Sequence, residues 1–173
     1  MIHSFAPLAE ADARCLILGS MPGQASLRAG QYYAHPRNQF WPIISALLNG
    51  NPAENYPQRC QRLIQHQIGL WDVLKACRRT TSLDADIETN SMICNDFEQF
   101  FNQHRMIKTV CFNGVTAANC FKRLVLPYLN LELELIQLPS TSPTHATMSL
   151  AAKQQVWQIL LNYAGKPAES SAY

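Results

Sequence analysis

The sequence predicts an α/β fold in which helices cover both faces of a central four-stranded parallel sheet, giving a single-domain, three-layer α/β/α architecture. Short apolar runs alternate with helical patterns along the chain, as expected for an α/β layer fold. The first run is nearly continuous in apolar residues and is closed by turn formers, which is typical of a strand buried on both faces. The 173 residues suit one ordinary domain. We expect this domain over residues 1–165 and a flexible, small and polar C-terminal tail at 166–173.

The strands and helices are predicted in turn. Four runs are expected to form the parallel strands: 14–19, 68–74, 107–113 and 133–139. Five intervening or closing segments have helical patterns: 40–48, 58–66, 93–102, 115–125 and 150–162. Pro42 fits the first of these helices because it falls in the opening turn, and Phe97, Phe100 and Phe101 are expected to point inward. The polar segment 78–90 is predicted to be a loop.

Charge and cysteine content exclude little. The net charge of +2, from 14 Lys+Arg against 12 Asp+Glu, is too small to predict binding to nucleic acid by itself, so any such surface would be a local patch. None of the six cysteines forms a C-x-x-C pair, and no spacing suggests a metal site. Free thiols in a reducing cytoplasm are the simplest reading. No apolar run approaches the roughly 20 residues that span a membrane, and no secretory signal is recognised.

Unusual polar residues gather where the strands are expected to end. They occupy the loop 20–38, Asp72, the Asn113-Gly114 pair and the loop 140–148. In open parallel sheets the ligand lies beyond the carboxyl ends of the strands. The coincidence of these segments therefore predicts a binding site at that edge.

The loop after the first strand is too long for a simple connector. Its opening turn, Gly19 to Gly23, can bring backbone N–H groups close to a ligand. The turn lacks the lysine of a phosphate-binding P-loop and the third glycine of a dinucleotide fingerprint. Its glycine and proline spacing alone is a weak signal.

Several motifs together carry a resemblance. The turn GSMPG and the stretch YAHPRNQFW (33–41) resemble the uracil-DNA glycosylase superfamily, in particular its mismatch-specific members. The whole pattern looks more like the hypoxanthine (deoxyinosine) DNA glycosylase branch. Its marks are present in order from residue 19 to 143: GSMPG, YYAHPRN-x-FW, LWDVL, FNG and LPSTSP.

The resemblance implies a uracil-DNA glycosylase-like fold and a monofunctional enzyme without a cofactor or metal. Such an enzyme flips a deaminated base out of DNA and hydrolyses its N-glycosidic bond. The base that the resemblance favours is hypoxanthine. The partner would be DNA containing that base, with no membrane, and we expect a cytoplasmic monomer. Two alternatives stay open: a uracil- or xanthine-DNA glycosylase of the same fold, and a lesion-binding DNA module without catalysis.

Two residues are the catalytic candidates, Asn38 and Asp72. The mismatch-specific enzymes place a water-positioning Asn where this chain has Met21, which cannot orient water. The hypoxanthine branch implies that Asn38 replaces it; the alternative is an N-cap of the following helix. Asp72 stands where relatives have an Asn that reads the base edge. An ionised Asp offers only acceptors, and the alternative is an Asp that binds backbone N–H groups of the next turn.

The remaining candidates are assigned by resemblance to two surfaces. The flipped base would lie among Gly19, Ser20, Met21, Tyr33, His35 and Asn113. Tyr33 would stack on the base; it could instead be a surface loop tyrosine. The DNA backbone would be bound by Arg37, Ser140, Thr141, Ser142 and His145. The family's His-Pro-Ser is replaced here by Leu138-Pro139-Ser140, and a plain Ser/Thr-rich turn is the alternative for this loop.

Overall fold

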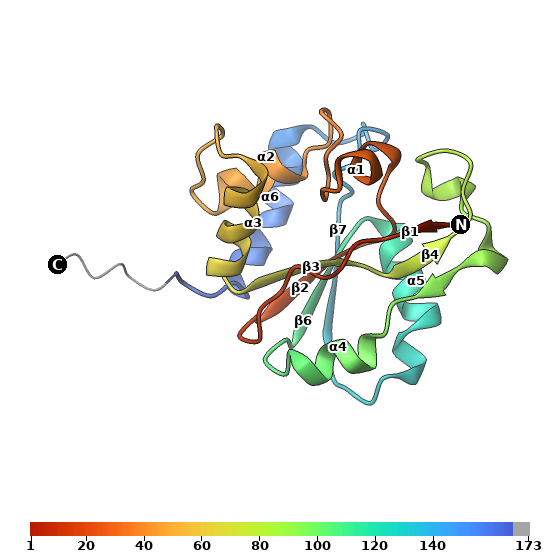
Figure 1. The fold of residues 1–173 in the computed structure, drawn as a ribbon. Coiled ribbons are helices and arrows are strands. Elements are labelled where there is room, and N and C mark those ends of the chain that lie inside the picture. Colours follow the sequence, from red (N-terminus) through yellow and green to blue (C-terminus); the bar gives the residue numbers. More distant parts are fainter. Residues whose placement is uncertain (168–173) are drawn as a thin grey trace.

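The computed structural model describes residues 1–167 and contains a central sheet of four parallel strands in the order β3-β2-β6-β7 (Figure 1). The four runs predicted as strands all contribute to this sheet: β2 (Cys15–Gly19), β3 (Ile68–Asp72), β6 (Thr109–Asn113) and β7 (Glu134–Leu138). The predicted tail, 166–173, lies outside the described residues except for its first two positions. The single-domain boundary at 165 stays a prediction.

Helices cover both faces of this sheet (Figure 1). One face packs against α2 (Phe40–Leu47), α3 (Tyr56–Gln65) and α6 (Leu150–Trp157), and the other against α4 (Phe97–Gln103) and α5 (Val115–Leu124). Alternate residues of each strand enter the two resulting cores, as the two-residue period of a strand requires. Leu16 and Leu18 of β2 belong to the core beneath α4 and α5, whereas Cys15 and Ile17 belong to the opposite one. The predicted three-layer α/β/α fold is confirmed.

We predicted a single strand over residues 68–74, but the structure divides this run between two strands. Strand β3 ends at Asp72, and β4 (Leu74–Cys77) joins β1 (Ile2–His3) and β5 (Ile93–Cys94) in a small antiparallel sheet. The backbone N–H of Val73 still donates to Gly19 O at 2.8 Å, so the chain follows β2 to its end before it turns away. The split places Asp72 at the last paired position of the parallel sheet.

Other differences are local. The loop 20–38 contains a short helix, α1 (Gln24–Ala29), which Gly30 terminates in the left-handed conformation with φ 63°. The helix expected from 93 begins only at Phe97, because Asp96 caps it by accepting a hydrogen bond from Gln99 N at 2.9 Å. The last helix tightens after Trp157 into a 3₁₀ turn, Gln158–Asn162. Further 3₁₀ turns cover Asp84–Asp86, Thr89–Ser91 and Leu126–Tyr128.

The six cysteines are all free, and four of them are buried. Phe97, Phe100 and Phe101 point inward as expected, each at most 4% exposed. Between residues 1 and 167, no helix has the length and apolar character that a membrane crossing requires.

Candidate active site

The carboxyl ends of the parallel strands bring four of the sequence-predicted residues together. Gly19 pairs with Asp72 across β2 and β3, while Asn113 ends β6 beside β7. A methyl group on Gly19 would lie 2.6 Å from Asp72 Oδ1 and 2.9 Å from the Tyr33 hydroxyl. Both polar groups therefore converge on the Gly19 Cα, and only glycine leaves room for them.

Asp72 is a buried acid, with 3% of its surface exposed. Its Oδ2 atom has no hydrogen-bond partner among residues 1–167. Burial, followed by the negative charge of Asp84, raises the pKa of the carboxyl from 3.8 to about 7, and Arg79 partly offsets the rise. At neutral pH the group thus exists in both forms, of which the protonated one can donate as well as accept a hydrogen bond.

Tyr33 is held in a strained position. Its φ of 53° lies in the left-handed region that side chains other than glycine rarely adopt, and such strain concentrates at functional sites. One face of its ring stacks on Phe40, with centroids 4.0 Å apart. Its buried hydroxyl has no hydrogen-bond partner in the described part of the chain, and burial beside Asp72 raises the Tyr33 pKa above its usual value.

Asn38, Asn113 and Thr141 form a hydrogen-bonded network that joins the two long loops. The Thr141 hydroxyl donates to Asn38 Oδ1 at 2.9 Å and accepts from Asn113 Nδ2 at 2.8 Å. The Thr141 backbone N–H donates to Asn113 Oδ1 at 2.9 Å. We expected Thr141 to bind the DNA backbone, but its side chain is fully buried. Its hydroxyl contacts the two asparagines instead.

The orientation of the Asn38 amide follows from these bonds. Its Oδ1 also accepts from the backbone N–H of Phe40 at 2.9 Å, at the start of α2. A carbonyl oxygen has two lone pairs, and both now have donors. The N-cap of α2 is Gln39, without a side-chain cap hydrogen bond, so the alternative of Asn38 as the N-cap is not what the structure shows. The group that Asn38 can offer a ligand is its Nδ2 donor.

Thr141→Val tests the network, since it keeps the shape of the side chain and removes the hydroxyl. The change leaves Asn113 Nδ2 without its acceptor and removes one of the two donors to Asn38 Oδ1. We expect unfolding free energy to fall by about 1–3 kcal/mol and any activity of the site to fall about tenfold. Urea unfolding and rate measurements check this, with Thr144→Val, an exposed change in the same loop, as the matched control. Equal effects of the two changes would contradict the positioning role.

Gly114 fixes the junction between β6 and α5. Its φ is 98°, and a Cβ there would lie 3.1 Å from the Ser140 Cβ. Its N–H donates to Leu138 O at 3.0 Å, which joins the ends of β6 and β7. Ser140 itself is engaged within its loop, where its hydroxyl accepts from Ser142 N at 3.2 Å.

Three residues expected at the base are placed differently. The Met21 side chain is buried in a small apolar cluster with Leu74 and Ile87, away from the polar strand ends. The Ser20 hydroxyl donates to Asp84 Oδ1 at 2.7 Å. His35 is exposed, and its Nδ1 accepts from Arg37 N at 3.1 Å, a local hydrogen bond within the loop.

The three other residues expected at the DNA backbone surround one surface hollow. This hollow of about 270 Å³ is lined by Arg37, Ser142 and His145 together with Lys153 of α6. Lys153 is 1% exposed, its Nζ donates to His145 O at 2.7 Å, and burial lowers its pKa. The hollow thus combines cations and a hydroxyl, the donor types that bind phosphate oxygens.

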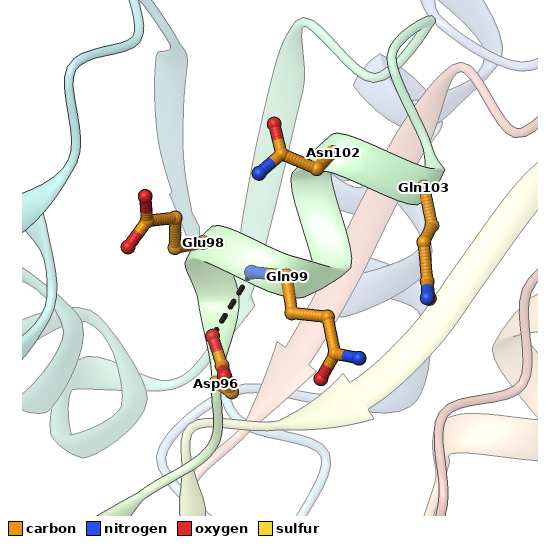
Figure 2. A pocket seen from close by; sticks show the side chains of 5 residues that line it. All are labelled: Asp96, Glu98, Gln99, Asn102 and Gln103. Atoms are coloured by element: carbon orange, nitrogen blue, oxygen red, sulfur yellow. Dashed lines mark hydrogen bonds between the residues drawn. The ribbon is translucent and has the colours of Figure 1, made fainter.

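A larger hollow lies elsewhere, on the outer side of α4 (Figure 2). It measures about 350 Å³ and is lined by five exposed polar side chains: Asp96, Glu98, Gln99, Asn102 and Gln103. None of the residues at the strand ends reaches it, and we assign it no function.

Three residues of the site region were missed by the sequence reasoning. Lys153 lies eight positions along the chain from its partner His145, inside a helix that gave only a packing signal. Arg79 and Asp84 lie in the polar segment that was predicted to be a plain loop. Their partners are about 60 residues away, with 64 positions between Ser20 and Asp84. No local pattern could have revealed these contacts. Among the described residues, no group of three or more His, Cys, Asp or Glu side chains is arranged to hold a metal ion.

Comparisons with known proteins agree with this geometry. The family model of the uracil DNA glycosylase superfamily matches residues 6–161. The chain is 37% identical to the hypoxanthine DNA glycosylase of Methanosarcina barkeri over 113 residues, which cover 65% of this chain and 70% of that protein. It is 34% identical to the hypoxanthine DNA glycosylase of Methanosarcina acetivorans over 113 residues, with the same coverage of 65% and 70%.

The fold is also similar to a solved structure. A solution NMR structure of a candidate uracil DNA glycosylase from Methanosarcina acetivorans matches with a TM-score of 0.74 and 30% identity, covering 91% of this chain and 97% of that chain. The family model spans most of the chain, and the first relative is covered over more than two thirds of its length. The chain belongs to the uracil DNA glycosylase superfamily.

Proposed function

We propose that this protein is a monofunctional DNA glycosylase that removes hypoxanthine from DNA in base excision repair. The observation that carries the proposal is the convergence of Asp72, Tyr33 and Asn38 at the strand ends of a uracil DNA glycosylase fold. The names of the two Methanosarcina relatives favour hypoxanthine over other deaminated bases. A base inside a duplex cannot reach this buried site, so the nucleotide must be flipped out at a cost of a few kcal/mol.

Base recognition is assigned to Asp72 and Tyr33. Deamination of adenine replaces the amino group by a carbonyl and leaves a hydrogen on the adjacent ring nitrogen. A protonated carboxyl can donate to that carbonyl from one oxygen and accept from that N–H with the other. The Oδ2 atom of Asp72, which has no partner among residues 1–167, would make one of these two bonds. The Tyr33 ring, braced by Phe40 on one face, would stack on the base with its other face.

Bond cleavage is assigned to Asn38. The C1′–N bond breaks through a cation-like sugar, and the departing base carries the electron pair. Preorganised donors at that position stabilise the transition state. The Nδ2 donor of Asn38, whose oxygen is anchored by Phe40 and Thr141, would serve this purpose without a cofactor. Further donors to the base would come from the backbone of the Gly19 turn.

DNA-backbone binding is assigned to the hollow at the start of α6, lined by Arg37, Ser142 and His145. Lys153 would hold the loop from behind through His145. We further propose that the protein acts as a cytoplasmic monomer, to which its free thiols are suited.

Arg37→Ala is expected to weaken binding to DNA of any sequence and to lower the slope of log affinity against log salt by about one. The physical reason is the loss of one phosphate contact with its released counterion. Titration of a fluorescent duplex at several salt concentrations measures both quantities. Arg105→Ala, an exposed arginine beyond α4, is the control; an unchanged slope for Arg37→Ala would remove this residue from the interface.

The proposed activity is tested on duplexes that carry hypoxanthine, uracil or xanthine at one position. Purified protein in the presence of EDTA should leave an alkali-labile abasic site fastest with hypoxanthine. A higher rate with uracil or xanthine would favour the alternative glycosylases. Tight binding without alkali-labile product would favour the non-catalytic lesion-binding module, for which the replacement of the usual polar residue by Met21 is the supporting observation.

A further inference from the structure

The segment between β4 and β5 returns to the opening turn of the site. Ser20 Oγ donates to Asp84 Oδ1 at 2.7 Å, and Gln24 N donates to Ser82 Oγ at 2.9 Å. The Arg79 guanidinium donates from Nη2 to Pro22 O at 2.6 Å. These contacts tie residues 79–84 to the Gly19–Gly23 turn, although the two segments are far apart in sequence.

Asp84 lies at the Gly19 turn through its contact with Ser20. Its side chain is partly exposed, at 38%. Ser20, whose hydroxyl binds Asp84, directly follows Gly19, and Gly19 lies against Asp72 Oδ1 and the Tyr33 hydroxyl. The charge of Asp84 accordingly adds to burial in raising the pKa of Asp72. The hydroxyl of Thr116, in the first turn of α5, is a further neighbour of Asp84. The carboxylate therefore lies beside the Gly19 turn, next to the glycine that contacts Asp72.

Arg79 holds this carboxylate in place. The arginine side chain is 1% exposed, and its Nη1 lies 3.9 Å from Asp84 Oδ1. Neither Nε nor Nη1 has a hydrogen-bond partner in the portion of the chain that the structure describes. A buried guanidinium without nearby negative charge is strongly destabilising. Asp84 and Asp72 supply that charge. Burial raises the pKa of Asp84 itself, and the Ser20 hydroxyl and the Arg79 charge partly offset that rise.

The proposed reaction needs an acceptor that the other residues do not supply. Water attacking the sugar must lose a proton, but both lone pairs of Asn38 Oδ1 already have donors. The carbonyls of Gly19 and Ser20 each accept a backbone hydrogen bond, from Val73 N and Leu74 N, and an amide carbonyl does not take up a proton near neutral pH. Met21 is buried in an apolar cluster. Asp72 lies deeper and titrates near neutrality.

We propose that Asp84 is a catalytic residue that orients the attacking water and stabilises the cation-like sugar, with Arg79 as its positioning residue; this rests on the proposed glycosylase function. As the C1′–N bond breaks, its electron pair leaves with the base. The water oxygen then bonds to C1′, one water proton passes to the Asp84 carboxylate, and the base takes up a proton from Asp72 or from solvent. Asp84 finally releases its proton to solvent. Asp72 and Asp84 thus divide the acid and base roles between a buried and an exposed carboxyl.

The test compares Asp84→Asn with Asp86→Asn, a matched change two residues along the same segment. Asp84→Asn keeps an oxygen that accepts from Ser20, so the segment can retain its shape. Single-turnover release of hypoxanthine should fall about 100-fold for Asp84→Asn and less than about threefold for Asp86→Asn. Affinity for a duplex with 2′-fluoro-deoxyinosine, whose fluorine blocks cleavage, should stay within about threefold for both. A rate for Asp84→Asn within about threefold of the unmodified protein would overturn the proposal.

Chemical rescue separates a catalytic carboxylate from a structural one. Added formate should raise the rate of base release by Asp84→Ala at least about tenfold and should leave the rate of Asn38→Ala unchanged. The reason is that only Asp84→Ala lacks a carboxylate. Absence of rescue in a variant with unchanged melting temperature would place Asp84 in a structural role. If the unmodified protein releases no deaminated base, the proposed function itself is wrong; if it is active and the Asp84 variants are equally active, only the role of Asp84 is wrong.

Discussion

Asn38→Ala is expected to slow base release at least about 100-fold, because it removes a donor that acts on the departing base in the transition state. Stability should fall by about 1–3 kcal/mol, because Phe40 N and the buried Thr141 hydroxyl both lose their acceptor. Single-turnover kinetics and urea unfolding measure the two effects separately. Asn102→Ala, an exposed asparagine of α4, is the matched control.

Asn38→Asp sharpens this experiment. The carboxylate keeps the oxygen that accepts from Phe40 and Thr141, but it has no N–H to donate. If Asn38 acts as a donor, Asp should be as slow as Ala while the protein stays folded. An Asp variant with close to normal activity would show that an acceptor is needed at this position, and near-normal activity of Asn38→Ala would remove the residue from the mechanism.

Asp72→Asn is expected to change how stability depends on pH. The folded pKa of Asp72 is raised from 3.8 to about 7, so the folded state binds more protons than the unfolded state between these values. Stability therefore falls as pH rises through this window and is lower by about 4 kcal/mol above it. Well below pH 3.8 both states are protonated and the group contributes nothing.

An uncharged amide cannot contribute this pH dependence. The difference in stability between Asp72→Asn and the unmodified protein should shift in favour of the variant by roughly 4 kcal/mol when the pH is raised from about 4 to about 8. Urea titrations at the two pH values measure the unfolding free energy of both proteins. Subtracting one from the other removes the contributions of the titrating groups that the two proteins share. Asp12→Asn, on the exposed surface, should show no such difference. If the stability of Asp72→Asn and that of the unmodified protein changed equally with pH, burial would not raise the pKa of Asp72 and this prediction would be wrong.

The sheet could be predicted because each of its strands carries its own signal. The run before Gly19 is apolar on both faces, and the same holds for the run before Asp72. The parallel arrangement then places Gly19, Asp72 and Asn113 at one edge without any knowledge of contacts. The break at Val73 was not predictable, because apolar residues continue across it into the small sheet.

The candidate site was predictable only in part, for a similar reason. Residue types identify Asn38 and Asp72, whereas the burial that perturbs Asp72 comes from the fold. Thr141 reads as a phosphate donor in a Ser/Thr-rich loop, but its burial turns it toward the asparagines. Arg79 and Asp84 look like ordinary loop charges, and their pairing with the Gly19 turn exists only in three dimensions.

The central claim is tested most directly by detecting the released base itself. A duplex with a single deoxyinosine is incubated with the protein and EDTA, and the products are separated by chromatography with mass detection. The account predicts free hypoxanthine in an amount equal to the abasic strand. Intact deoxyinosine strand with bound protein, or release of uracil but not hypoxanthine from parallel duplexes, would contradict it.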